Sequence, residues 1–350
     1  MRIILDGMGG DNAPDAIVEG AVQAAERLEE GSGILIVGKE DVIKASLAKF
    51  TKRAKDGTYA GGKIRIVHAE DVITNDESPV RAIRRKKESS IVKGITMLKE
   101  GEGDCFVSAG STGALLAGGL LILGRIEGID RPSLATIYPV IGAEPSLILD
   151  AGANAECRAA NLQEFGVMGS VYMEKVLGRK DPTVGLINIG TEEGKGTSLT
   201  KEAFKLLSEA DINFIGNVES RELQNSCADV IVTDGFTGNA LIKLTEGVGQ
   251  MVLREMKKRF TADMKSKMGA LLLKDQLLGI KKEFNYSEYG GAPILGVKGV
   301  ILKSHGSSDA MAVRQTILKA VPFVENDVVG TIEREITGIT EDDADDVADI

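Results

Sequence analysis

The chain has 350 residues, 43% of them hydrophobic and 27% charged, with a formal net charge of −10 at pH 7. This length can bury a large core, and the acidic balance argues against a general nucleic-acid-binding protein. The longest apolar run, at 114–124, is too short to cross a bilayer, and three cysteines without C-x-x-C spacing indicate a reduced, cytoplasmic chain without disulfides or a metal site.

The first predicted element is a short apolar strand that ends in the glycine-rich loop "LDGMGGDNAP" at 5–14. A helical segment follows, so the free backbone N–H groups of the loop and the helix dipole favour an anion. The dinucleotide pattern G-x-G-x-x-G fails, because Asn12 stands at its third glycine. Two interpretations remain open: a tight turn in which Asn12 caps the helix, or a phosphate site formed by Gly9, Gly10, Asp11 and Asn12.

Most later strands follow the same plan, in which an apolar, β-branched run ends in a small or polar loop that leads into a helix. This alternation predicts a doubly wound α/β fold, with a mostly parallel sheet and helices on both faces. Ligands of such folds bind beyond the carboxyl ends of the strands.

A basic cluster begins one predicted helix, in the segment "RAIRRKKESS". Charge runs are usually solvated helix faces, yet this one would also suit docking of an acidic protein. The docking candidates are Arg81, Arg84, Arg85, Lys86 and Lys87.

Three further loops place small hydroxyl or amide side chains at strand ends: "VSAGSTGA", "LDAGANAEC" and "NIGTEEGKGTS". The last one resembles a P-loop but fails its spacing, and glycine rather than serine or threonine follows Lys195. With the opening loop they predict a composite site for free phosphate or a phosphorylated ligand. Its candidates are Ser111, Thr112, Gly113, Asn154, Asn188, Lys195, Gly196 and Thr197, to which "VTDGFTGN" adds Asp234 and Asn239.

From about 240 to 285 the strand pattern stops, and a long helical stretch predicts a protruding hairpin. Its basic, leucine-rich character suits the surface of an anionic membrane or an acidic partner. The alternative is a dimer interface or plain core packing. The leucine-rich run contributes Leu271, Leu272, Leu273, Leu277, Leu278 and Ile280.

Near the C-terminus, His305 lies in "KSHGSSDA", another loop before a helix. It suits a general acid/base or a carbonyl-polarising donor as well as a structural role. The segment 341–350 holds six acids and no base, so we expect it to be solvated and poorly ordered. The remaining residues, 1–340, are predicted to form a single α/β domain.

Ten motifs in chain order carry a family resemblance, among them "MGGDNAP", "PVRAIRRKKESS", "VSAGSTGA", "NIGTEEGKGT", "DGFTGN" and "HGSSDA". Across residues 1–325 the chain resembles the bacterial phosphate acyltransferases of fatty acid and phospholipid synthesis, the PlsX family. Ser111 departs from the asparagine expected in that family.

The resemblance implies an enzyme that moves a long-chain acyl group from acyl carrier protein to inorganic phosphate, without a cofactor. The acyl phosphate would pass to a membrane-bound glycerol-3-phosphate acyltransferase. The implied fold is that of the isocitrate/isopropylmalate dehydrogenases and phosphotransacetylases, as a homodimer in peripheral contact with the inner face of the cell membrane. The acidic carrier protein gives the basic cluster a partner.

Phosphate is already an anionic nucleophile, so direct transfer is expected, with a pocket that aims phosphate and stabilises the oxyanion. Lys195, His305 and Asn154 are the expected catalytic residues. Two alternatives stay open: a nicotinamide-dependent dehydrogenase on the related fold, and a non-catalytic membrane-associated scaffold.

Overall fold

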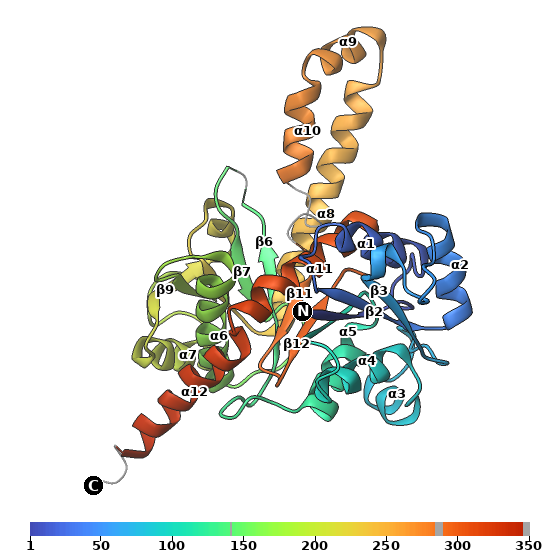
Figure 1. The fold of residues 1–350 in the computed structure, drawn as a ribbon. Helices are drawn as coiled ribbons and strands as arrows, with labels where there is room; N and C mark the ends of the chain where they lie inside the picture. The colour runs from blue at the N-terminus through green and yellow to red at the C-terminus, as the bar shows by residue number, and fades with distance from the viewer. Residues whose placement is uncertain (141, 284–289, 346–350) are drawn as a thin grey trace.

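The computed structural model describes residues 1–140, 142–283 and 290–345. Their strands form two sheets, whereas the strand pattern in the sequence predicts one (Figure 1). Both sheets are mostly parallel, and helices cover them on both sides. The predicted doubly wound α/β class is therefore confirmed.

The seven-stranded sheet is parallel over its first five strands, and its last two strand pairings are antiparallel. Side chains alternate along a strand, so Ile3 and Leu5 of its third strand pack into one core cluster and Ile4 into the other. A strand buried on both faces requires the continuous apolar run seen in the sequence. The spatial order is β3 (Ile64–His68), β2 (Gly33–Gly38), β1 (Arg2–Asp6), β4 (Cys105–Ser108), β12 (Val300–Lys303), β11 (Ala292–Leu295) and β5 (Ser133–Leu134).

The five-stranded sheet begins one residue after β5, because only Ala135 separates β5 from β6. Apart from the antiparallel β6–β7 pair, its neighbouring strands are parallel. One cluster of buried side chains includes residues of both sheets, such as Ile3 and Leu147. The order is β6 (Thr136–Tyr138), β7 (Ser146–Leu149), β10 (Val230–Val232), β8 (Thr183–Asn188) and β9 (Asn213–Glu219).

The helices divide between the faces according to the core cluster that each one joins. On one side of the first sheet lie α1 (Asp15–Ala25), α2 (Glu40–Phe50) and α11 (Ala310–Glu325). On the other lie α3 (Pro79–Arg85), α4 (Ser90–Lys99) and α5 (Thr112–Gly118), which continues as the π-helical turn η2 (Gly119–Leu123). The second sheet packs against α6 (Ala159–Leu177) and α7 (Ser198–Glu209), with α12 (Val328–Asp345) against α6. Short 3₁₀ turns occupy η1 (Ala60–Gly62) and η3 (Ser220–Asn225).

The remaining helices, α8 (Gly235–Phe260), α9 (Met264–Leu272) and α10 (Lys274–Glu283), form a hairpin that projects from the body of the molecule (Figure 1). This confirms the predicted protrusion for its described residues. Leu271 and Leu272 are 71% and 86% exposed, Leu273 is also exposed, and Leu277 is half-buried. The side chains of Leu278 and Ile280 lie outside the described residues.

At the C-terminus, α12 extends into the acidic segment 341–350 as far as Asp345. Residues 346–350 lie outside the described part of the chain, so the disorder expected there remains a prediction.

Candidate active site

A cavity of about 890 Å³ lies where loops that follow strands of both sheets meet the first half of α8. The loops after β4 and β12 come from the first sheet, and the loop after β7 comes from the second. Of the predicted site residues, Thr112, Asn239 and His305 line this cavity. The other lining residues that matter below are Gly110, Leu134, Ala151, Gly152, Ile137, Ile242, Lys243, Glu246, Leu253, Lys303 and Ser307.

Asp6, the last residue of β1, ties the opening loop to the loop after β4. Its buried carboxylate accepts hydrogen bonds from Ser108 Oγ at 2.7 Å and from Met8 N at 3.0 Å. Burial raises the pKa of Asp6, and these hydrogen bonds oppose the rise. Glycine is required at Gly9, because a Cβ there would lie 2.4 Å from Asp6 Oδ2 and 2.6 Å from the amide nitrogen of Gly110.

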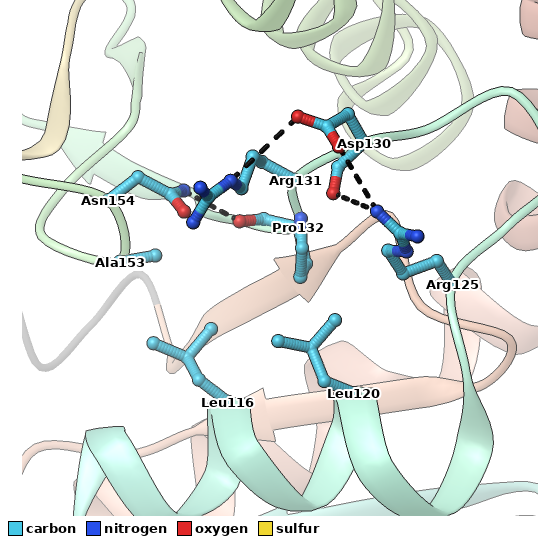
Figure 2. A pocket seen from close by; sticks show the side chains of 8 residues that line it. All are labelled: Leu116, Leu120, Arg125, Asp130, Arg131, Pro132, Ala153 and Asn154. Carbon is cyan, nitrogen blue, oxygen red and sulfur yellow. Dashed lines mark hydrogen bonds and ion pairs between the residues drawn. The ribbon is translucent and has the colours of Figure 1, made fainter. Parts of the chain in front are cut away.

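Asp150 plays the same structural role in the loop after β7. One carboxylate oxygen accepts from the backbone N–H groups of Leu134, Gly152 and Ala153 at 3.0–3.1 Å, and the other accepts from Asn154 N at 2.6 Å. Burial raises the pKa of Asp150. The side-chain amide of Asn154 donates both to Asp150 Oδ2 at 2.9 Å and to the carbonyl of Pro132 at 2.8 Å. Asn154 thus spends its donors on positioning the loop, and it lines a second, smaller cavity (Figure 2).

His305 follows β12, and the hydrogen bonds on its ring define its tautomer. Nδ1 accepts from Ser307 N at 3.2 Å and lies 2.8 Å from Ser307 Oγ. Burial lowers the pKa of His305, and the nearby charge of Lys243 lowers it further. A ring nitrogen that accepts a backbone N–H carries no proton, so the contact with Ser307 N favours the tautomer with the proton on Nε2. His305 can therefore donate a hydrogen bond from Nε2 into the cavity.

The opening loop holds the loop of His305 in place. Asn12 Nδ2 donates to the carbonyls of Ser307 at 3.1 Å and Ser308 at 3.2 Å, and Asp11 N donates to the carbonyl of Gly306 at 2.7 Å. The opening loop therefore has a role that neither the helix-cap nor the phosphate-site interpretation included, which is to position the loop after β12. Its asparagine side chain contacts the loop after β12, and Pro14, not Asn12, is the N-cap residue of α1.

Two lysines that the sequence did not single out line the cavity, Lys303 at the end of β12 and Lys243 on α8. Burial lowers the pKa of Lys303 to about 8, and its ammonium donates to the carbonyl of Ser304. Lys243 Nζ lies 2.7 Å from Glu246 Oε2. The sequence feature that could have identified Lys303 is its position as the last residue of an apolar strand, immediately before the loop of His305.

The loop after β8 forms a separate group. Lys195 is not among the described residues that line the cavity, and its Nζ lies 3.9 Å from Glu192 Oε1 with its side chain half-exposed. Asn188 Nδ2 donates to the carbonyl of Lys195 at 3.1 Å and to Asn217 Oδ1 at 3.0 Å. Thr197 caps α7, and Gly196 has a positive φ of 92° beside it. The strand order explains the separation, because β10 lies between β7 and β8.

Other predicted site residues serve helix starts and packing. Ser111 Oγ accepts from Ala114 N at 3.4 Å and caps α5, while Asp234 accepts from Thr237 N at 2.9 Å and caps α8. Gly113 packs against Pro79, which a Cβ would approach to 2.7 Å. Gly10 has a φ of 101°, the left-handed region that favours glycine.

The basic cluster occupies α3 and the two residues after it. Arg81, Arg84, Arg85 and Lys87 are exposed. Lys86 instead forms intramolecular hydrogen bonds, since its ammonium donates to Glu77 Oε1 at 2.7 Å and to the carbonyl of Val72 at 2.8 Å. Four of the five predicted docking residues are therefore free to meet a partner at the surface.

Among the described residues, no helix is both long and apolar enough to cross a membrane. Within the same residues, no group of three or more histidine, cysteine, aspartate or glutamate side chains is arranged to hold a metal ion.

The doubly wound α/β fold of the chain is shared with phosphotransacetylases of known structure. It resembles a phosphotransacetylase from Streptococcus pyogenes with a TM-score of 0.59 and 17% identity, over 93% of this chain and 94% of that one. A branched-chain phosphotransacylase from Enterococcus faecalis V583 has a TM-score of 0.56 and 14% identity, over 93% and 99% of the two chains. At these identities the likeness concerns the fold alone.

The sequence defines the family more closely. Residues 1–331 match the family described as "Fatty acid synthesis protein", and the chain belongs to it. It is 49% identical over 343 residues to the phosphate acyltransferase of Alkaliphilus oremlandii, covering 98% of this chain and 99% of that protein. It is 46% identical over 342 residues to that of Clostridioides difficile, with 98% of each chain covered. The predicted family and the acyltransferase class are confirmed, and the dehydrogenase and scaffold alternatives are not favoured.

Proposed function

We propose that the chain transfers a long-chain acyl group from acyl carrier protein to inorganic phosphate and so forms acyl phosphate for phospholipid synthesis. The observation that carries this proposal is the chemistry gathered in one cavity. Two lysines can bind an anion, a neutral imidazole can donate to a carbonyl oxygen, and an apolar wall can accept a fatty chain.

Phosphate binds beside Lys303 and Lys243 in this proposal. Charge-assisted hydrogen bonds from ammonium groups to phosphate oxygens are strong, and partial burial of Lys303 strengthens them by excluding water. The bound phosphate in turn favours the charged form of Lys303, opposing the effect of burial. An anion held there lies in the same cavity as His305.

The transfer needs no enzyme nucleophile. A phosphate oxygen attacks the thioester carbonyl carbon, and the carbonyl π electrons move to oxygen, where the Nε2–H of His305 stabilises the oxyanion. The tetrahedral intermediate collapses, the C–S bond breaks, and the thiolate leaves with that electron pair. Burial raises the pKa of Cys157 to about 11, so this thiol is a poor nucleophile at neutral pH.

The acyl chain lies along α8 in this proposal. Ile242 and Leu253 on that helix and Leu134 and Ile137 on the opposite side supply apolar surface to the cavity. Because α8 continues into the projecting hairpin, the chain would extend in the direction of the hairpin (Figure 1).

The surface features support the partners expected for such an enzyme. The exposed members of the basic cluster, Arg81, Arg84, Arg85 and Lys87, would dock the acidic carrier protein. Leu244, Val248 and Met251 form an exposed stripe on α8 at helical spacing, which suits pairing with a second copy as a homodimer.

The exposed leucines at the far end of the hairpin suit peripheral contact with the inner face of the cell membrane, from the cytoplasm. Acyl phosphate formed there would be delivered to a glycerol-3-phosphate acyltransferase.

The test uses the purified protein with palmitoyl-acyl carrier protein and inorganic phosphate, and traps acyl phosphate with hydroxylamine. We expect hydroxamate that depends on phosphate. If palmitoyl-acyl carrier protein is hydrolysed equally fast without phosphate, the chain is a thioesterase. A covalent acyl adduct on the enzyme, detected by mass spectrometry, would exclude direct transfer.

A further inference from the structure

The described part of the chain also forms a second cavity, of about 300 Å³ (Figure 2). Leu116 and Leu120 form one side and point from their helix toward Pro132. Arg125 and Arg131 lie at its other margin, one on each side of Asp130. The cavity therefore combines an apolar floor with cationic groups, and no step of the reaction above uses it.

The same helix and the same loop line both cavities, and in each element the residues of the first cavity precede those of the second in the sequence. Along the helix, Thr112 lines the first cavity, and Leu116 and Leu120, four and eight residues later on the same face, line the second. Opposite them, the loop after β7 gives Ala151 and Gly152 to the first cavity and the next two residues to the second. The two cavities therefore follow one another along the same two elements, and we refer to the pair as the groove; Thr112 and Leu120 lie about 12 Å apart along the helix at 1.5 Å per residue.

Asp130 organises the cationic end of the groove. It accepts from Arg125 Nη1 at 3.2 Å, from Arg158 Nη2 at 2.5 Å and from Asn161 Nδ2 at 3.0 Å. The hydrogen bonds from Asn161 and Arg158 lower the pKa of Asp130, so the carboxylate remains charged and holds the arginines in place.

Arg131 is the cation that stays available. Its Nε lies 3.8 Å from Asp130 Oδ2, beyond hydrogen-bond distance, and its side chain is 57% exposed. Across residues 1–140, 142–283 and 290–345, its guanidinium donates no hydrogen bond. A guanidinium with five unused donors matches the oxygens of a phosphate diester.

We propose that this second cavity binds the arm on which the acyl group is carried, a flexible chain with a phosphodiester at one end and a thioester at the other. The phosphodiester meets Arg131 with Arg125, the middle of the arm crosses Leu116 and Leu120, and the thioester reaches His305. This inference rests on the proposed function, since it assumes an acyl thioester as donor.

The fatty chain is the competing occupant of the groove, and the structure favours the arm. The apolar floor of the second cavity consists of two leucines beside arginine side chains, whereas the larger cavity offers four large aliphatic side chains, Leu134, Ile137, Ile242 and Leu253. A fatty chain gains nothing from an arginine with free donors, but a phosphodiester does.

The experiment compares two soluble donors that differ only in the phosphate, palmitoyl-phosphopantetheine and palmitoyl-pantetheine. The wild-type protein should show a KM about tenfold lower for the phosphorylated donor, as expected for a charge-assisted contact. Arg131→Ala should abolish that difference and leave the KM for inorganic phosphate unchanged. The matched control is Arg221→Ala, an exposed arginine on η3 that should retain the difference.

A second variant fills the groove without disturbing the core, since Leu120 is 39% exposed. Leu120→Trp should raise the KM for both donors with an unchanged preference for acyl-chain length, and thermal melting confirms that it folds. Persistence of the phosphate preference in Arg131→Ala, or a shifted chain-length preference in Leu120→Trp, would overturn the inference alone. A wild-type protein that forms no acyl phosphate from any donor would overturn the proposed function and this inference with it.

Discussion

The loop after β12 and the loop after β8 look alike in the sequence but differ in the folded molecule. Each follows a parallel strand and combines a lysine, a glycine and small hydroxyl side chains. The first, with Lys303 and His305, lines the large cavity and is held by Asn12 from a distant part of the chain. The second, with Lys195, is held by Asn188 at the end of its own strand and stays half-exposed.

The difference shows that strand order, more than loop composition, decides which loops share a site. β12 lies beside β4 in the first sheet, and the loops after both strands line the cavity. β8 is separated from β7 by β10, so its loop occupies a more distant position on the same edge. Burial then distinguishes the two lysines chemically, because it lowers the pKa of Lys303 to about 8.

The largest effect should come from His305. We expect His305→Ala to lower kcat about 100- to 1,000-fold, the usual loss for one oxyanion-hole donor, with little change in the KM for phosphate. Steady-state kinetics of acyl phosphate formation measure both. His305→Gln, whose amide can still donate, should recover part of the rate; equal rates for the two variants would mean that the ring acts in some other way than by donating.

Lys303 should show opposite effects on activity and stability. Lys303→Met should lower kcat/KM for phosphate about 10- to 100-fold, through loss of a charge-assisted contact. Burial lowers the pKa from 10.5 to about 8, so at pH 7 the folded protein bears the cost of a buried charge that the unfolded chain does not. Removal of that charge should raise the free energy of unfolding at pH 7 by about 1–2 kcal/mol, less than the full pKa difference implies, because the hydrogen bond to the carbonyl of Ser304 is lost as well.

The sign of this stability effect can be checked by pH. Between about pH 8 and 10.5 the unfolded chain binds the extra proton, so stability of the wild type should rise with pH and approach that of Lys303→Met. Urea unfolding at pH 7 and pH 9.5 measures the gap. A gap that widens at the higher pH would contradict the assignment of a buried, destabilising ammonium.

Part of this site was predictable from the sequence and part was not. Apolar strands ending in glycine-rich loops predict the α/β fold and the edge where His305, Thr112 and Asn239 lie, because local patterns determine strands and their direction. The partition into two sheets was not predictable, since register and strand order depend on contacts between distant residues. For the same reason Lys195 was expected in the site, while Lys243, an unremarkable position on a helix, was missed.

Substitution of Lys195 tests directly whether the loop after β8 differs in function from the loop after β12. A half-exposed cation outside the cavity can attract phosphate to this edge without touching the reacting carbonyl. We therefore expect Lys195→Ala to raise the KM for phosphate up to about tenfold, more at low than at high salt, with kcat nearly unchanged. A fall in kcat of about 100-fold, the loss typical of an oxyanion donor, would place Lys195 against the reacting atoms, as the sequence alone predicted.

The smallest effects should separate the two asparagines that hold these loops. Asn12→Ala releases the loop of His305, so kcat should fall about tenfold, in line with the cost of misplacing a catalytic group. Asn188→Ala breaks three hydrogen bonds of a residue that is 9% exposed, so it should cost about 1–3 kcal/mol of stability but change kcat less than about threefold. Thermal melting with steady-state kinetics on both variants distinguishes the outcomes. Equal losses of kcat in the two variants would mean that both loops reach the substrate. The separation of the loop after β8 from the cavity would then apply only to the protein without substrate.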